Sequence, residues 1–103
     1  MFRHVVMFQW VEGVTADQIA ESEAALAALP GRIPELRAYG FGADAGLADG
    51  NFDYAVVADF DDVAGYERYR DHPAHREVIV QHLAPIIATR VAVQHEVAGA
   101  TGA

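Results

Sequence analysis

The residues best suited to chemistry lie in the segment 69–75, which reads Tyr-Arg-Asp-His-Pro-Ala-His. Proline lacks an amide hydrogen and has a fixed φ, so it fits the first turn of a helix but not its middle. The spacing therefore predicts a break between two helices that lets Tyr69 and either His72 or His75 reach one cavity. An imidazole titrates near neutral pH and a phenol can donate to an oxyanion, so side chains of these types can do acid–base chemistry, although a histidine at a helix joint is more often a cap or a surface group.

Composition sets limits on the fold and on the partners. The chain has 103 residues, which is the size of one domain with a modest core. It contains no cysteine and no lysine, which excludes disulfides, thiolate metal sites and Schiff bases on a lysine side chain. The net charge of -8 repels phosphate backbones, so we expect no nucleic-acid partner.

The two ends of the chain carry no sign of membrane insertion. Residues 1–11 are apolar, but they are too few to span a bilayer and are interrupted by Arg3, His4 and Gln9. They also lack the pattern of a signal peptide, so we expect a cytoplasmic protein without a membrane partner. Residues 98–103 are small and predict a flexible tail after a domain of residues 1–97.

Local patterns predict an alternation of strands and helices. Residues 2–10 alternate as a strand does, with apolar side chains on both faces. Thr15 and Gln18 match a capping box that opens a helix, and Pro30 ends it. The remaining patterns predict, in order, strands over 36–43 and 52–60, a helix over 63–70, a second helix from the proline through Leu83, and a strand over 89–97. This order predicts an α+β, ferredoxin-like β-α-β-β-α-β fold with a four-stranded antiparallel sheet.

The two faces of the sheet are predicted to have different roles. The bulkier face of the first strand, with His4, Val6 and Phe8, is expected under the helices, together with Val91 and Val93 of the last strand. The other face is too apolar to remain in water, which predicts a homodimer whose two sheets pack together as a dimeric α/β barrel. The expected contact residues are Arg3, Val5, Met7, Ala55, Val57, Ala92 and Gln94.

The fold order also predicts which residues meet at the site. The first strand lies between the third and the fourth, so we expect Tyr54 and His95 to flank His4 below the helix break. A pocket touching His4, Tyr69 and His75 follows, with His75 within hydrogen-bond reach of one of the other two. Its expected apolar wall consists of Phe2, Val6, Val56, Ala58, Phe60, Val91 and Val93.

Three stretches together resemble a known family. They are the opening Phe-Arg-His-Val-Val-Met-Phe, Tyr69 with the His-Pro-Ala-His joint, and the His-Leu-Ala-Pro-Ile of residues 82–86. In this order they resemble the stress-responsive dimeric α/β-barrel (Dabb) family over residues 2–97. The resemblance implies a ferredoxin-like homodimer. Some plant members are polyketide cyclases that close a ring by aldol condensation with a His–Tyr acid–base pair.

The resemblance implies roles for individual residues. His75 and Tyr69 match the catalytic pair, and His4 matches a further histidine of the first strand. Tyr54 stands where such a cyclase has another histidine, which puts substrate recognition in doubt. His75 would then remove a proton α to a ketone, Tyr69 would stabilise the oxyanion or orient His75, and no metal or organic cofactor is expected. The expected substrate-binding residues are His4, Tyr54, Phe2, Val6, Val56 and Val91.

Other interpretations remain open. The chain could bind a small hydrophobic carbonyl compound without turnover, form a stress-linked structural homodimer with an incidental cavity, or resemble the cofactor-free monooxygenases of the wider dimeric-barrel group. His72 is also explained as a helix cap, His4 as a satisfied buried histidine, and Tyr54 and Tyr69 as core aromatics. A metal held by His72 and His75 would have two ligands at most, which is too few.

Overall fold

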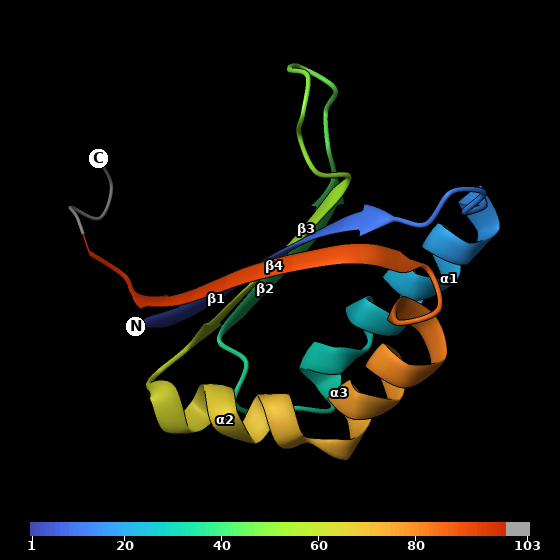
Figure 1. The fold of residues 1–103 in the computed structure, drawn as a ribbon. Helices are drawn as coiled ribbons and strands as arrows, with labels where there is room; N and C mark the ends of the chain where they lie inside the picture. Colours follow the sequence, from blue (N-terminus) through green and yellow to red (C-terminus); the bar gives the residue numbers. More distant parts are fainter. Residues whose placement is uncertain (99–103) are drawn as a thin grey trace.

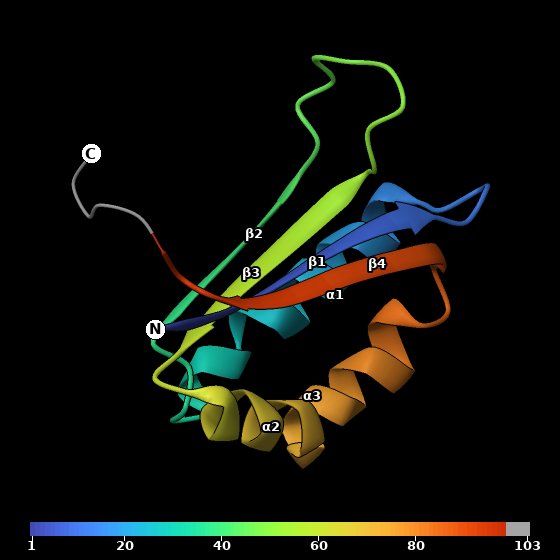
Figure 2. The same cartoon turned by 60° about the vertical axis from the view of Figure 1, so that its left-hand side comes forward.

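The structure, a computed structural model, describes residues 1–98 and consists of one sheet with helices on one of its faces (Figure 1). All neighbouring strands pair antiparallel in the order β2-β3-β1-β4, which Figure 2 shows from left to right. The predicted ferredoxin-like fold is therefore confirmed. The elements are β1 (Phe2–Trp10), α1 (Ala16–Ala27), the short 3₁₀ helix η1 (Leu29–Gly31), β2 (Ala38–Ala43), β3 (Tyr54–Phe60), α2 (Val63–Asp71), α3 (Pro73–Val78), the π-helical segment η2 (Ile79–Leu83) and β4 (Ile87–Glu96).

Capping and strand pairing explain where the elements begin. The capping box is present, because Thr15 Oγ1 accepts from Gln18 N at 3.1 Å and Gln18 Oε1 accepts from Thr15 N at 2.9 Å. β3 begins two residues later than predicted, although the Asp53 N–H still donates to the Phe8 carbonyl of β1 at 2.8 Å. The flexible tail predicted over residues 98–103 lies, from residue 99 on, outside the described residues.

The core lies between the helices and the predicted face of β1. Val6 and Phe8 are buried there, against Val56 of β3 and Leu83 of η2. The burial pattern of β1 alternates as a two-sided strand requires, since His4, Val6 and Phe8 are buried while Met7 is exposed. The assignment of the faces of β1 is therefore correct.

The predicted faces of β4 are wrong. The register pairs His4 with Gln94, Val6 with Ala92, and Phe8 with Arg90. Residues directly opposite each other in an antiparallel pair lie on the same face, so Arg90, Ala92 and Gln94 face the helices. Val91, Val93 and His95 accordingly lie on the outer face, and Ala92 and Gln94 do not.

The outer face keeps an apolar stripe across β1 and β4. Met7, Val91 and Val93 are 41%, 40% and 54% exposed, although all three are large apolar side chains. Beside the stripe, Arg3 donates to Asp59 at 2.7 and 2.9 Å and covers that carboxylate. The surface expected for a second subunit is thus present, with Val91 and Val93 in place of Ala92 and Gln94.

Within the described residues, no helix is both long and apolar enough to cross a membrane. The cytoplasmic location stays a prediction.

Replacing Phe8 by alanine tests the core. The side chain is 2% exposed, so Phe8→Ala should lower the free energy of unfolding by about 3–5 kcal/mol, through lost burial and the cavity left behind. Leu47→Ala is the control, because Leu47 is 89% exposed and should change stability by less than about 0.5 kcal/mol. Urea titration followed by circular dichroism measures both. Equal losses in the two variants would contradict this description of the core.

Candidate functional site

The site is built around the break between α2 and α3. Pro73 opens α3, and His72 caps it in an extended conformation, with ψ 134° and its Nδ1 accepting from Ala74 N at 3.0 Å. The chain therefore changes direction between Tyr69 in the last turn of α2 and His75 in the first turn of α3. Their rings come to lie against each other, with centroids 4.2 Å apart and planes inclined by 38°. His72 itself is a cap.

A small cavity of about 40 Å³ lies between this break and the sheet. His4, Tyr69 and His75 all line this cavity, so the structure brings together the three residues that the sequence predicts to meet in one pocket. The other lining residues are Val6, Phe8, Leu26, Tyr39, Val56, Ile79, Leu83 and Arg90. His75, Ile79 and Arg90 also line a neighbouring hollow of about 260 Å³, together with Arg70, Arg76 and Val80. The two spaces thus share three residues of their walls, and we refer to them as the inner cavity and the outer hollow of the site.

His4 is held as a neutral hydrogen-bond donor. Gln94 Nε2 donates to His4 Nδ1 at 2.8 Å, and because an amide nitrogen cannot accept, the imidazole proton must lie on Nε2. Burial lowers the pKa of His4 to about 4, and the nearby charges of Arg90 and His75 act in the same direction. At neutral pH, His4 therefore offers an N–H to an oxygen atom in the cavity.

His75 has the opposite tautomer. Its Nδ1 lies 3.1 Å from the carbonyl oxygen of Arg70, which can only accept, so Nδ1 carries the proton and Nε2 presents a lone pair. Burial lowers the pKa of His75, while the bond to the Arg70 carbonyl opposes the shift and the charge of Arg90 adds to it. A neutral imidazole with a free Nε2 is the form that a general base requires.

Tyr69 contacts His75 with its ring, and its hydroxyl turns elsewhere. The hydroxyl lies 3.5 Å from the hydroxyl of Tyr39 on β2. Burial raises the pKa of Tyr69, so the phenol stays protonated at neutral pH. In residues 1–98, His75 makes no hydrogen bond to Tyr69 or His4, so the predicted bond is wrong. The reason is the break itself, which stacks the two rings.

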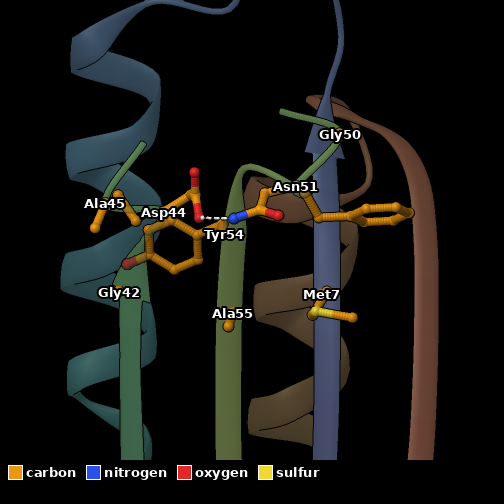
Figure 3. Close-up of a pocket in the computed structure, with 10 residues that line it drawn as sticks. Met7, Gly42, Asp44, Ala45, Gly50, Asn51, Tyr54 and Ala55 are labelled. Atoms are coloured by element: carbon orange, nitrogen blue, oxygen red, sulfur yellow. Dashed lines mark hydrogen bonds between the residues drawn. The ribbon is translucent and has the colours of Figure 1, made fainter. Parts of the chain in front are cut away.

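Tyr54 does not flank His4. It lies opposite Phe8, four residues further along β1, and the β3 residue opposite His4 is Ala58. The Tyr54 hydroxyl donates to Glu23 Oε2 on α1 at 2.6 Å. Tyr54 instead lines a hollow of about 540 Å³ beneath the β2–β3 loop (Figure 3). In that loop Asn51 Nδ2 donates to Asp44 Oδ1 at 3.1 Å, which Figure 3 shows as a dashed line.

The predicted apolar wall is only partly in place. Val6 and Val56 line the inner cavity. Phe2 lies on the helix face but packs against Tyr66 at the far end of β1, with ring centroids 6.0 Å apart. Val91 lies on the outer face opposite Met7, and His95 lies there opposite Arg3, so neither reaches the cavity from this chain.

The residues of the site that were not predicted from the sequence include Tyr39, Arg90 and Gln94. Arg90 and Gln94 would have been found had the other alternating set of β4 been placed under the helices. Among residues 1–98, no three His, Asp or Glu side chains gather so as to hold a metal ion.

The pKa of His4 predicts how stability depends on pH. The unfolded chain binds a proton at this site near pH 6.5, whereas the folded chain binds it only near pH 4, so stability falls as pH drops from about 6.5 to 4. The loss should reach about 3 kcal/mol for a shift of this size. His4→Gln removes the titrating group and should flatten the dependence over that range. Urea unfolding at several pH values measures it, and equal slopes in the two proteins would contradict the assignment.

Comparison with known proteins places the chain in a family. The family model described as "Stress responsive A/B Barrel Domain" (Dabb) matches residues 2–97. A comparison with curated proteins found no match.

Solved structures agree with the family match. A dimeric ferredoxin-like protein of unknown function from Thermobifida fusca is 50% identical, with a TM-score of 0.86, and the match covers 93% of this chain and 90% of that one. Two more distant structures show the same fold. A protein from Arabidopsis thaliana is 18% identical with a TM-score of 0.86, over 98% of this chain and 99% of that one. A hydroxynitrile lyase from Passiflora edulis is 23% identical with a TM-score of 0.83, over 96% and 94% of the two chains. The family match over nearly the whole described chain therefore shows that this protein belongs to the Dabb family.

Proposed function

We propose that this protein binds a small hydrophobic carbonyl compound at the break between α2 and α3 and catalyses cofactor-independent acid–base chemistry on it. One observation carries the proposal. The same apolar cavity is lined by a neutral donor, His4, a neutral acceptor, His75, and a protonated phenol, Tyr69. Convergent polar groups in an apolar pocket are the usual mark of a binding or active site.

His75 acts as the base in this proposal. Its Nε2 lone pair takes a proton from the carbon next to a carbonyl group, the electron pair of that C–H bond forms a C=C bond, and the π pair of the C=O bond moves to the oxygen to give an enolate. His4 Nε2–H and the Tyr69 hydroxyl donate to the oxygen as it becomes negative. In an aldol cyclisation the enolate carbon then attacks a second carbonyl of the same molecule, and protonated His75 returns its proton to the new alkoxide.

Tyr39 completes the donor side of the site. Its hydroxyl lies 3.5 Å from that of Tyr69, so it can donate to Tyr69 while Tyr69 donates to the substrate. Both hydroxyls have a pKa raised by burial, which keeps their protons in place at neutral pH. Such a chain polarises the donor nearest the substrate.

The dimensions fit a division of the ligand between the two spaces. The inner cavity of about 40 Å³ is much the smaller of the two spaces, so we assign to it the carbonyl group of the ligand. The hollow of about 260 Å³, bordered by Ile79 and Val80, can hold the apolar remainder.

Binding without turnover is the second candidate. The engagement of the Tyr69 hydroxyl with Tyr39 and the narrow inner cavity favour it, since both leave less room for a reacting group. Detection of proton transfer separates the two candidates.

We also propose that two copies pair through the outer faces of their sheets to form an α/β barrel. The exposed stripe of Met7, Val91 and Val93 needs cover, and similar structures from Thermobifida fusca, Bacteroides fragilis and Jannaschia are described as dimeric. The site lies on the opposite face of the sheet, so pairing leaves the proposed chemistry in each subunit accessible.

Hydrogen–deuterium exchange tests the proposed base without knowledge of the natural substrate. The protein, incubated in D₂O with small aryl alkyl ketones, should accelerate exchange at the α-carbon, measured by proton NMR. His75→Ala should abolish the acceleration, and Tyr69→Phe should reduce it by roughly 10- to 10⁴-fold. The accelerated rate should rise with pH through a pKa below 6.5, because only neutral His75 can act as the base.

His82→Ala is the matched control for that experiment. His82 lies in η2 and is absent from the wall of either space, so its loss should leave the exchange rate unchanged. If ketones stabilise the wild-type protein against heat but exchange no faster than in buffer, binding without turnover is the better description. If they do neither, the proposed function is wrong.

Substitution of one apolar residue by a charged one tests whether the outer face of the sheet is the dimer contact. The wild-type protein should sediment with about twice the mass of the 11.1 kDa chain at micromolar concentration. Val93→Glu places a carboxylate on the apolar stripe and should give a folded monomer, because an unpaired charge is costly to bury. Leu47→Glu, on the exposed β2–β3 loop, is the control and should remain dimeric. A wild-type monomer would refute the dimer.

A further inference from the structure

Arg90 occupies an unusual position in the site. It projects from β4 on the helix face, opposite Phe8, and borders both the inner cavity and the outer hollow. The rest of the inner wall is formed by apolar, aromatic and imidazole side chains. A guanidinium at the junction of the two spaces is therefore the one permanent charge that a ligand reaching the inner cavity would meet among the residues that line it.

Within residues 1–98 no carboxylate pairs with Arg90. The ion pairs of that part of the chain involve Arg3, Arg37, Arg68 and Arg70. Arg76, which also borders the hollow, has no such partner either. Arg70 is the third arginine of the hollow, and its charge is already matched by Asp71 at 2.9 Å.

This arrangement contrasts with the rest of the chain. Acidic residues outnumber basic ones by 15 to 7, yet no acidic residue lines either space of the site. The charge of Arg90 is strong enough at the site to lower the pKa of both His4 and His75. A local positive potential in an acidic protein attracts an anion to this place and to few others.

We propose that the ligand of this site is a small oxocarboxylate, with its carboxylate bound by Arg90 and its carbonyl group in the inner cavity. The planar guanidinium offers two parallel N–H groups, which match the two oxygens of a carboxylate. Because Arg90 borders the inner cavity itself, the carboxylate carbon should lie one or two bonds from the carbonyl carbon. This inference rests on the proposed function, and it changes the expected substrate class from small hydrophobic carbonyl compounds to 2- and 3-oxo acids.

The proximity of charge and carbonyl has a chemical consequence. Deprotonation next to the carbonyl creates a second negative charge, on the enolate oxygen, close to the carboxylate. The guanidinium neutralises the first charge, and His4 and Tyr69 donate to the second. Arg90 would thus bind the substrate and reduce the repulsion that otherwise opposes formation of a dianion.

Calorimetric titration with matched ligand pairs tests the inference. Pyruvate, acetoacetate and phenylglyoxylate are each compared with the corresponding amide, which keeps the carbonyl group and the shape but lacks the charge. The wild-type protein should bind at least one acid at least about tenfold more tightly than its amide, as expected for a charged hydrogen-bonded pair. Arg90→Gln should abolish this preference, so that the acid binds no more tightly than its amide.

Two further variants control for general effects of charge. Arg32→Gln removes an exposed arginine that lines neither space, so the preference should remain. Arg90→Lys keeps the charge but loses the paired N–H groups, and it should retain only part of the preference. Because Arg90 is exposed, the melting temperatures of these variants should match that of the wild type, which shows that each is folded.

The outcomes separate this inference from the proposed function. Equal affinity for acids and amides would overturn the inference that the site recognises a carboxylate, and so would failure of every acid to bind. Loss of the preference in Arg76→Gln but not in Arg90→Gln would overturn the assignment to Arg90. In each case, accelerated exchange of neutral ketones by wild-type protein would leave the proposed chemistry standing.

Discussion

The site depends on one constraint, the inability of Pro73 to continue α2. In an unbroken helix, residues six positions apart differ by about 240° of rotation, so the side chains of Tyr69 and His75 would point about 120° away from each other. The proline ends that helix, and His72 spans the break with its ring accepting from the first free N–H of α3. The two rings then meet at 4.2 Å above the sheet. A backbone restriction thus creates the contact from which the proposed chemistry starts.

Hydrogen bonds from outside the cavity determine what each imidazole can do. Gln94 donates to His4 Nδ1, so the other ring nitrogen, Nε2, carries the proton. The Arg70 carbonyl accepts from His75 Nδ1, so His75 Nε2 keeps a lone pair. Burial and the nearby charge of Arg90 both disfavour protonation of either ring. One donor and one acceptor are therefore maintained at neutral pH, although the two side chains are chemically identical.

The two faces of the sheet carry different features. Its helix face carries the core and the cavity, while its outer face carries the apolar stripe and the Arg3–Asp59 pair. Because strand side chains alternate between the faces, neighbouring residues such as Arg90 and Val91 lie on different faces. The proposed assembly and the proposed ligand binding therefore depend on separate residues even within a single strand.

The sequence by itself determined the order of the elements, the break at Pro73, the family, and the meeting of His4, Tyr69 and His75. These depend on local features, namely a proline, capping residues and alternation, or on the connectivity of the fold. The sequence did not determine that Arg90 and Gln94 face the helices, or that Tyr54 lies beside Phe8 and not beside His4. In β4 one alternating set contains Val91 and Val93 and the other contains Arg90 and Gln94, so local alternation favoured placing the valines under the helices, which is the wrong face. Only pairing with β1 fixes that register, because it depends on residues about 90 positions apart in the chain, such as His4 and Gln94.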